Sequence, residues 1–558
     1  MKRSLLFAWI MIFAMLLCAC DGTKTGEPND STAVDSVPRK IELVADGKAL
    51  YKIVIPEVSG GDVSRAADAL KNKLKSLTGA FFTVTDDYTR DGKPVESSGE
   101  IIIGNCRRTQ MQTALLALSY RDYSVSVTDE NILIAGYEEA KVSDAVYAFI
   151  KVLDEAHIEK SGDKVFLKWD QDIRKDYTSY KLDGLSLEDI PFNQYRIVYP
   201  VNGLTSTAIS EYIKIAQEVQ DHIGRRCGYV LQICPDTEAP QEYEILIGKT
   251  NRSESLAFYA SEIGPKQLEY GVAIRNHKVL IFGGGLYSMS SAADVFNGKI
   301  SSLTTPVLRL FSDSKATLAN SSIPKAAGDY RFMTYNILFE DWASGEIPAA
   351  VEIRKEPVSY LLLNYAPDVA ALQECFDNWN TQLPELLADE YEYVCYKRND
   401  SITNRSPLIY KKSKLNLIDS GYVDLDKTLT NNRRVVTWAV FEDKITGEQF
   451  AVLGTHWHPT DAAEKLRQSQ ITAALAKKIC SERNIPAIAM GDFNSVPGSD
   501  SYDNFKSTSG LELVTGTNGV DHVFYTKDFT AVAQGYESEN CARKASDHFP
   551  VWIDLNLK

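Results

Sequence analysis

Residues 491–494, Gly-Asp-Phe-Asn, place a carboxylate and an amide two positions apart, directly after an apolar run at residues 485–490. A short apolar run predicts a buried strand, and side chains at positions i and i+2 of a strand point to the same face. Asp492 and Asn494 are therefore expected to face one ligand. A carboxylate beside an amide suits a hydrated cation or a phosphate oxygen, although Asp-x-Asn also forms ordinary turns.

Similar polar motifs stand at or just after the ends of other apolar runs in the same part of the chain. They are Asn336, Gln373-Glu374, Thr455-His456-Trp457-His458, Asp521-His522 and Ser546-Asp547-His548. Hydrolysis of a phosphate ester needs charge neutralised on the phosphate oxygens, a water aimed in line and a stabilised leaving oxygen. Carboxylates that bind a hard divalent cation, together with histidines, meet these needs.

The order of these motifs resembles the endonuclease/exonuclease/phosphatase superfamily, which includes deoxyribonuclease I-like nucleases, abasic-site endonucleases, neutral sphingomyelinases and inositol-polyphosphate phosphatases. The resemblance covers residues 328–558, and residues 405–410 and 433–438 fit the middle strands of the family. It implies a four-layer α-β-β-α sandwich, in which two packed mixed β-sheets are flanked by helices. The site is then expected at the rim where the strands end.

The resemblance also implies a metal site for Mg²⁺ or Mn²⁺. Glu374 is the expected first ligand, Asn336 lies near it, and Asp547 is a second candidate, either directly or through a water molecule. These are oxygen donors, which hard divalent cations prefer. The resemblance leaves open whether one or two cations bind.

The catalytic roles that the resemblance implies fall on five residues. His548 is expected to lie against the scissile phosphate, and the carboxylate of Asp521 is expected to orient its ring. Asp492 would activate or orient the attacking water, while Asn494 and His456 would donate hydrogen bonds to phosphate oxygens. The sequence leaves open whether Asp492 or His548 is the general base.

Three further side chains, Arg405, Arg434 and His458, are candidates for binding the substrate. Either arginine could instead pair with acidic neighbours at the surface. His522 occupies a position where the family often has an aromatic residue, so we expect it to pack in the core. Cys375 is expected on the opposite face of its strand from the preceding glutamate, and therefore buried.

The N-terminus has the features of an export signal. A basic start precedes an apolar run at residues 5–17, which is short for a membrane span. The run ends in Leu-Cys-Ala-Cys, which resembles the lipobox of bacterial lipoproteins and makes Cys20 the expected site of acylation. Residues 1–20 are thus predicted to be a lipoprotein signal and residues 21–39 a flexible tether. We expect an exported, lipid-anchored protein at the cell envelope, periplasmic or at the cell surface; a plain secretory signal is the alternative.

The composition indicates a multidomain body of 558 residues, 44% hydrophobic and 24% charged. A formal net charge of −15 argues against a general nucleic-acid binder. It does not exclude a nuclease, because a metal ion can supply local positive charge. The cysteines form no Cys-x-x-Cys pair, so we expect no zinc site. Cys227 and Cys234 are close enough in sequence to pair, although two small apolar residues are the preferred interpretation.

Residues 40–325 contain an internal repeat. Glu-Ile-Ile-Ile-Gly at residues 100–104 returns as Glu-Ile-Leu-Ile-Gly at residues 244–248, and a strand-like run at 51–56 returns at 195–200. A pattern of apolar residues with helical spacing follows the first strand of each copy. Each copy is therefore expected to fold as a small sheet covered by helices.

The two copies, at residues 40–185 and 186–325, are expected to be α+β domains that precede a catalytic domain at residues 328–558. Their shared motif resembles the accessory domain before the barrel of several glycoside hydrolases, which implies a spacer or a platform for contact with a glycan or a protein partner. Three glycines at residues 283–285 follow a strand without GxGxxG spacing. A tight turn into a helix is therefore preferred over phosphate binding.

Together these features predict a Mg²⁺-dependent hydrolase of phosphate esters, a phosphodiesterase or a phosphatase, held at the bacterial cell envelope by a lipid anchor. The expected substrates are small phosphate esters, phospholipid head groups or glycosyl phosphates, with nucleic acids less favoured. Two alternatives stay open. One is a secreted or surface nuclease, and the other is a lipoprotein that binds a glycan or a partner without catalysis.

Overall fold

The computed structural model describes residues 39–57, 59–89, 93–263, 268–310, 312–318, 323–340, 347–348, 350–396, 406–425, 434–511, 513–538 and 541–558. Contacts group the chain into two units: the first holds the described residues up to Ala117 together with Tyr123–Lys175, and the second holds Leu118–Asp122 and Asp176–Lys558. The predicted signal, including Cys20, lies outside the described residues. No helix within these ranges is both long and apolar enough to cross a membrane.

The first unit is built on a six-stranded sheet in the order β10-β6-β7-β5-β3-β4. Its strands are β3 (Lys52–Ile55), β4 (Val84–Asp86), β5 (Glu100–Ile103), β6 (Tyr123–Val127), β7 (Asn131–Gly136) and β10 (Ile173–Lys175). The strands β4, β3, β5 and β7 pair in parallel, and β6 and β10 extend the sheet with antiparallel pairs. A smaller sheet has the order β2-β1-β9-β8, with β1 (Arg39–Ala45), β2 (Lys48–Ala49), β8 (Ile158–Ser161) and β9 (Lys164–Trp169).

Helices cover the larger sheet of this unit. They are α1 (Gly61–Thr78), α2 (Thr109–Leu115) and α3 (Glu139–Val152), and a short 3₁₀ turn follows at Glu155–His157. Ala66, Leu70 and Leu74 recur every four residues of α1 and are buried in the core beside the strands. The helix ends where Gly79 adopts a φ of 83° and donates its N–H to the carbonyl of Lys75.

The second unit begins with a module, residues 186–318, whose six-stranded sheet has the order β14-β13-β15-β17-β16-β19. Its strands are β13 (Arg196–Tyr199), β14 (Ile233–Pro235), β15 (Glu244–Ile247), β16 (Glu269–Arg275), β17 (Lys278–Gly283) and β19 (Ser314–Thr317), and its helices are α4 (Ser206–Cys227), α5 (Ser253–Glu262) and α6 (Leu286–Ser301). The strand order, the parallel and antiparallel pairs and the helix positions follow the pattern of the first unit. A small sheet joins β11 (Ser186–Leu187), β12 (Ile190–Pro191) and β18 (Val307–Leu308), with a 3₁₀ turn at Phe192–Gln194.

A buried glutamate begins β5 in the first unit and β15 in the second module. Glu244 is fully buried and pairs with three cations, at 2.6 Å from Arg196, 2.9 Å from Arg252 and 3.2 Å from Lys278. Burial alone would raise the pKa of Glu244, but the hydrogen bonds from these partners lower it to about 2. The corresponding residue of the first unit, Glu100, pairs with an arginine and a lysine, and its pKa is also lowered.

The C-terminal domain contains two six-stranded sheets. The first has the order β22-β23-β21-β20-β31-β30, with β20 (Tyr330–Asn336), β21 (Val369–Gln373), β22 (Tyr391–Val394), β23 (Leu408–Lys411), β30 (Phe529–Tyr536) and β31 (Val551–Leu557). The second has the order β24-β25-β26-β27-β29-β28, with β24 (Leu415–Asp424), β25 (Val435–Asp443), β26 (Gln449–His456), β27 (Ala487–Asp492), β28 (Leu513–Asn518) and β29 (Asp521–Tyr525). Both sheets are mixed.

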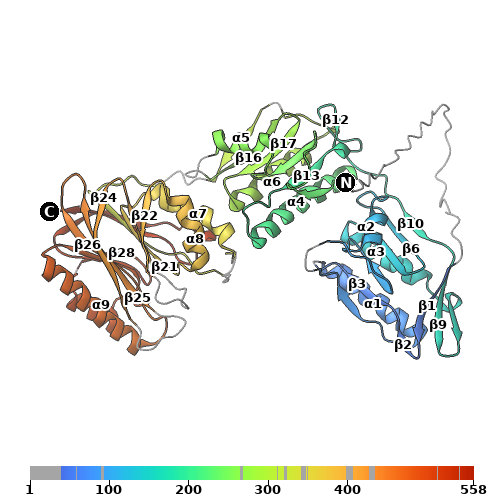
Figure 1. Ribbon diagram of the computed structural model, residues 1–558, viewed down its shortest axis with the longest axis horizontal. Coiled ribbons are helices and arrows are strands. Elements are labelled where there is room, and N and C mark those ends of the chain that lie inside the picture. Colours follow the sequence, from blue (N-terminus) through green and yellow to red (C-terminus); the bar gives the residue numbers. More distant parts are fainter. Residues whose placement is uncertain are drawn as a thin grey trace, which may run out of the picture. The chain divides into compact units, whose positions relative to one another are not determined.

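The two sheets pack face to face and helices cover their outer faces. Phe332, Val452 and Ile553 are among the residues buried between the sheets. The helices α7 (Val351–Tyr365), α8 (Asp377–Leu387) and α11 (Ala542–Ala545) pack on the first sheet, and α9 (Ala462–Arg483) and α10 (Asp500–Thr508) pack on the second. Figure 1 shows α7 and α8 near β21 and β22, and α9 beside β25 and β26. The four-layer sandwich that the sequence predicts is therefore present.

Candidate active site

The functional side chains meet at one edge of the sandwich because of how the strands pair. β20 and β21 are parallel, as are β26 and β27, so each pair brings two carboxyl ends to the same edge. His456 lies opposite Asp492 across the second pair, and Asp492 lies opposite Asp521 across the antiparallel pair of β27 and β29. Asn336 ends β20 in the other sheet, and its Nδ2 donates to Asp492 Oδ2 at 3.1 Å. The site therefore spans both sheets.

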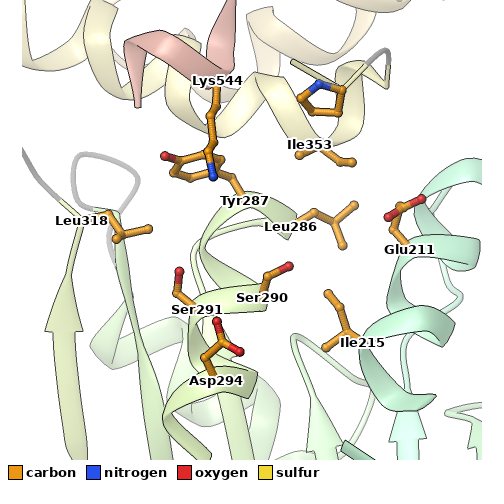
Figure 2. A pocket seen from close by; sticks show the side chains of 11 residues that line it. Glu211, Ile215, Leu286, Tyr287, Ser290, Ser291, Asp294, Leu318, Ile353 and Lys544 are labelled. Carbon is orange, nitrogen blue, oxygen red and sulfur yellow. The ribbon is translucent and has the colours of Figure 1, made fainter. Parts of the chain in front are cut away.

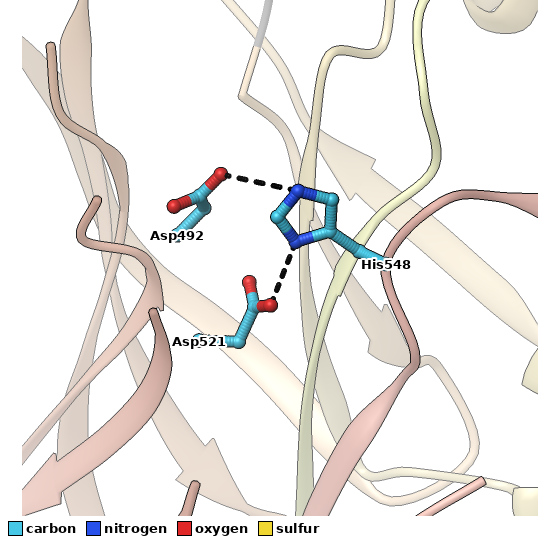
Figure 3. A group of neighbouring side chains, drawn as sticks. All are labelled: Asp492, Asp521 and His548. Atoms are coloured by element: carbon cyan, nitrogen blue, oxygen red, sulfur yellow. Dashed lines mark hydrogen bonds and ion pairs between the residues drawn. The ribbon is translucent and has the colours of Figure 1, made fainter. Parts of the chain in front are cut away.

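Asp521 and Asp492 flank the ring of His548, as Figure 3 shows. His548 Nδ1 lies 2.7 Å from Asp521 Oδ2, and Nε2 lies 3.8 Å from Asp492 Oδ2. Burial lowers the pKa of His548, but the hydrogen bond and charge of Asp521, with the charge of Asp492, outweigh it and raise the pKa to about 10. The contact with Asp521 therefore favours the doubly protonated ring, which presents its Nε2–H to the site.

One oxygen of Asp492 is the point on which several donors converge. Its Oδ1 accepts from the N–H of Asn494 at 2.9 Å, which leaves Oδ2 facing the site. His456 Nε2 lies 3.3 Å from that oxygen. Arg434 contacts Nδ1 of His456, and because a guanidinium only donates, Nδ1 is the acceptor and Nε2 carries the proton. His456 is thus a neutral ring that donates toward Asp492.

The expectation that Asp492 and Asn494 share one strand face is wrong. β27 ends at Asp492, and Asn494 adopts a φ of 45° in the turn that follows. Its side-chain Nδ2 donates to the carbonyl of Trp457 at 3.0 Å, and its own carbonyl accepts from Lys465 at 2.8 Å. The turn that Asp-x-Asn commonly forms is what the chain adopts. Asn494 orients Asp492 through its backbone N–H.

Glu374 stands just after β21 with a φ of 61°, a conformation that costs a non-glycine residue about 1 kcal/mol or more. Its Oε2 accepts from the N–H of Phe339 at 2.9 Å, and its Oε1 accepts from Asn336 Nδ2 at 3.3 Å. The side-chain oxygen of Asn336 accepts from the N–H of Leu338 at 3.1 Å. Asn336 thus presents its amide nitrogen to two carboxylates and links Glu374 to Asp492.

The donor set at this edge fits a hard divalent cation. Candidate ligand atoms of Asp492, Asp521 and His548 lie within 4.8 Å of one another. Asp521 Oδ1 is buried and has no hydrogen-bond partner among the described residues. Asp547 is exposed beside them and adds its charge to the surroundings of His548. Carboxylate oxygens from Glu374 and these residues are the ligands that Mg²⁺ or Mn²⁺ prefers.

Arg434, His458 and His522 differ in burial and in hydrogen-bond partners. Arg405 lies outside the described residues. Arg434 is buried and contacts Nδ1 of His456. His458 Nδ1 accepts from the N–H of Asp461 at 3.0 Å, which places this ring in the turn before α9. His522 is fully buried and its Nε2–H donates to the carbonyl of Ser495 at 2.8 Å, as expected of a packing residue.

Three cysteines and the glycines at residues 283–285 lie where the sequence predicts. Cys375 is fully buried, as predicted. Cys227 and Cys234 are buried without a disulfide between them, so the interpretation as two small apolar residues is confirmed. The glycines at residues 283–285 lead directly into α6, with Gly285 as the residue before the helix, as the turn interpretation predicts.

Sequence reasoning overlooked Arg354 in α7. This arginine is fully buried. It donates to the carbonyls of Ile337 at 2.7 Å, Leu338 at 2.9 Å and Phe339 at 2.9 Å. Its sequence neighbours Glu352, Lys355 and Glu356 are also charged, so no local signal marks Arg354 as buried.

Residues 333–548 match the Endonuclease/Exonuclease/phosphatase family. The match covers most of the two sheets that form the site and supports an endonuclease/exonuclease/phosphatase domain at the C-terminus.

Among known proteins, the chain is 25% identical over 272 residues to the CCR4-Not complex 3'-5'-exoribonuclease subunit Ccr4 of Mycosarcoma maydis, which covers 38% of this chain and 40% of that protein. It is 28% identical over 215 residues to Protein angel of Drosophila melanogaster, which covers 35% of this chain and 58% of that protein. The chain thus spans about half the length of these two relatives. A crystal structure of an endonuclease/exonuclease/phosphatase from Bacteroides vulgatus aligns with 41% of this chain and 99% of that chain, at 23% identity and a TM-score of 0.37.

Proposed function

We propose that the C-terminal domain hydrolyses phosphate esters with the help of a divalent cation, Mg²⁺ or Mn²⁺. The observation that carries this proposal is the convergence on Asp492 Oδ2 of Asn336 Nδ2 at 3.1 Å, His456 Nε2 at 3.3 Å and His548 Nε2 at 3.8 Å. A carboxylate oxygen next to donors from both sheets suits a reaction in which water is deprotonated beside an anionic phosphate. The family match to residues 333–548 supports the same class of reaction.

The chain's own residues supply distinct parts of this reaction. Asp521 holds Nδ1 of His548, so that Nε2–H points toward the site and donates to a phosphate oxygen. We assign the general base to Asp492 rather than to His548, because Asp492 Oδ2 is an acceptor that faces the site, whereas Nδ1 of His548 is held by Asp521 and Nε2 carries the proton. His456 Nε2–H is a further donor for a phosphate oxygen, while the two Nδ2 hydrogens of Asn336 hold Glu374 and Asp492 together. Arg434 holds His456 in the donating tautomer.

The residues proposed to hold the cation are Glu374 and Asp547, with Asn336 orienting Glu374. When bound, the cation neutralises charge on the phosphate and stabilises the leaving oxygen. The carboxylate oxygen of Glu374 is already fixed by the N–H of Phe339 at 2.9 Å, so binding requires little rearrangement of that side chain.

The proposed substrate is a small phosphate ester, a phospholipid head group or a glycosyl phosphate at the cell envelope, with the protein exported and anchored through Cys20. The net charge of −15 disfavours a long polyanion. A nuclease is the second candidate, because one relative of the C-terminal domain is named an exoribonuclease subunit. We propose contact with a glycan or a protein partner as a further role of the two modules.

The test is a hydrolysis panel with the full-length protein and Mg²⁺ or Mn²⁺. The panel holds a phosphodiester, a phosphomonoester, sphingomyelin, single-stranded RNA and plasmid DNA. Asp492→Asn is the inactive variant, and Asp500→Asn, an exposed residue in α10, is the matched control. Hydrolysis of one substrate class that is lost only in Asp492→Asn supports the proposal and selects the substrate. A folded protein that hydrolyses nothing in the panel contradicts it and favours a binding lipoprotein.

A further inference from the structure

Helix α7 of the C-terminal domain contacts the second module (residues 186–318) through a buried carboxylate. Glu356 accepts from Ser288 Oγ at 2.6 Å and from Ser288 N–H at 3.0 Å. Ser288 lies in the first turn of α6, where backbone N–H groups point outward and favour an anion. A Cβ on Gly285 would lie 2.8 Å from Glu356 Oε2, so the carboxylate uses the space that this glycine leaves. The helix N-terminus after the glycines is thus filled by a side chain of the C-terminal domain.

A second carboxylate on the same face of α7 makes a similar contact. Glu352 lies one turn before Glu356, and its Oε1 accepts from Thr205 Oγ1 at 2.7 Å, just before α4. Ile353 beside it packs against the core of the second module. Both glutamates are less than a tenth exposed. Two hydrogen-bonded carboxylates and one apolar side chain therefore attach α7 to the module.

Part of this junction is open. A cavity of about 420 Å³ lies between the module and the C-terminal domain, with Leu286, Ser290 and Asp294 on one side and Ile353 and Lys544 on the other. Figure 2 shows these side chains around the open space. Beside this gap, Tyr287 and Leu318 of the module pack against the core of the C-terminal domain, so the two glutamates share the attachment with apolar contacts.

The opposite side of the same helical turn contacts the active site. Arg354 donates to three successive carbonyls, from Ile337 to Phe339, and to the carbonyl of Ala545 at 3.4 Å. The guanidinium also lies over the ring of Trp379, at 5.1 Å from its centroid. Phe339 donates its N–H to Glu374, and Ala545 directly precedes the Ser-Asp-His motif. One side chain thus holds the backbone segment that contacts Glu374 and the segment that leads into Asp547 and His548.

We propose that α7 couples the second module to the active site, with Glu356 as the docking residue and Arg354 as a positioning residue for Glu374, Asp547 and His548. This rests on the proposed function of the site. The planar fork of arginine reaches several carbonyls at once, which an ammonium group does not. When Glu356 loses Ser288, α7 loses its support on one face and Arg354 shifts with it. A displacement of about 1 Å at a reacting group is enough to cost up to about a hundredfold in rate.

The variants for the test are Arg354→Lys, Glu356→Ala and Glu356→Gln in the full-length protein. Glu356→Gln keeps an acceptor for Ser288 Oγ and is the conservative rescue. Glu482→Ala, an exposed glutamate in α9, and Arg225→Lys, an exposed arginine in α4, are the matched controls. Three quantities are measured: the Kd of Mn²⁺ without substrate by calorimetry, kcat and KM on the substrate that the panel identifies, and the midpoint of thermal unfolding.

We expect Arg354→Lys to lower kcat about tenfold or more and to raise the Kd of Mn²⁺ several-fold, with KM changed less than twofold. Glu356→Ala is expected to lower kcat about threefold and to raise the Kd of Mn²⁺ about threefold. Glu356→Gln is expected to restore most of both values. A Glu356→Ala protein with wild-type Kd and kcat overturns the coupling, even if its unfolding midpoint falls. If the wild-type protein hydrolyses no substrate, the proposed function fails while the Kd of Mn²⁺ still decides the coupling. If Arg354→Lys does not fold, the comparison of Glu356→Ala with Glu356→Gln decides it.

Discussion

Asp521 and His548 are joined by a 2.7 Å contact although they belong to different sheets of the sandwich. Asp521 begins β29 in one sheet, and His548 precedes β31 in the other. The pair therefore forms only when the two sheets are packed together. Its geometry reports the integrity of the domain as well as the state of the active site.

Replacing Asp521 by Asn is expected to lower kcat by about 10²–10⁴-fold, because the amide no longer stabilises the imidazolium form of His548 or fixes its orientation. The side chain is about the same size and is 1% exposed, so we expect the domain to remain folded. Steady-state kinetics with circular dichroism on the same sample tests this. Activity within twofold of wild type would show that Asp521 has no part in orienting His548.

Removing divalent cations with EDTA is expected to abolish hydrolysis, and Mg²⁺ or Mn²⁺ is expected to restore it. The cation should also stabilise the fold: at about a hundred times its Kd, a bound ion adds about 2.7 kcal/mol to the free energy of unfolding. We expect Glu374→Gln to remove most of this gain, measured by thermal unfolding with and without Mg²⁺. Glu482→Gln, at an exposed site in α9, is the control. An equal gain in both variants would place the ion elsewhere.

The stability of the second module is expected to fall in acid because of Glu244. Its pKa drops from the ordinary 4.5 to about 2 in the folded chain. A lowered folded-state pKa contributes stability above the unfolded value, and this contribution disappears as the pH falls from about 4.5 to about 2. The shift corresponds to about 3 kcal/mol. Denaturant unfolding between pH 6 and pH 2 measures the slope, and Glu244→Gln should flatten it. A slope that this variant leaves unchanged would argue against Glu244 as the titrating group.

His522 is expected to act in packing and not in catalysis. It lies between Phe493 at 5.8 Å and Tyr502 at 5.1 Å, measured between ring centroids. Burial lowers its pKa, so the ring is neutral. His522→Phe keeps an aromatic ring of similar volume and should leave kcat within about threefold, whereas His522→Ala opens a cavity and should cost about 3 kcal/mol of stability. A large loss of kcat in a stable His522→Phe protein would assign the residue a catalytic role.

Gly491 is expected to tolerate no side chain. A Cβ at this position would lie 2.1 Å from the carbonyl oxygen of Thr455 on the neighbouring strand. Gly491→Ala therefore forces β26 and β27 apart at the residues before His456 and Asp492, and we expect a loss of stability of about 2 kcal/mol or more together with a loss of kcat. Chemical denaturation and kinetics test this, with Gly498→Ala, in an open turn, as the control for a left-handed glycine. Equal losses of stability and kcat in both variants would show that the close approach of a Cβ to the Thr455 carbonyl is not the cause.

The sequence predicts the strand ends of the site well because each is marked locally. An apolar run followed by a polar residue is enough to place Asp492 at the end of β27 and Asn336 at the end of β20. What the sequence does not contain is the distance between strands of different sheets. The contact of Asn336 with Asp492 joins residues 156 positions apart and depends on how the two sheets stack.

Two other features lie beyond what local patterns predict. After Asp492 the chain could continue as a strand, or it could turn so that the N–H of Asn494 donates to Asp492. The same residues fit both conformations, and the chain adopts the turn. The role of Arg354 depends on carbonyls from two distant segments. An arginine in a helix is usually solvated, so neither its burial nor its partners follow from its place in the sequence.

The position of β31 in its sheet bears on when the enzyme can form during synthesis. Val551–Leu557 lies between β20 and β30, and it pairs along its length with the first strand of the domain. Until these residues leave the ribosome, β20 exposes an unpaired edge and the first sheet stays divided. The site that depends on both sheets is therefore assembled only after β31 has been made. We expect a chain that lacks β31 to be inactive and prone to aggregate through the open edge of β20.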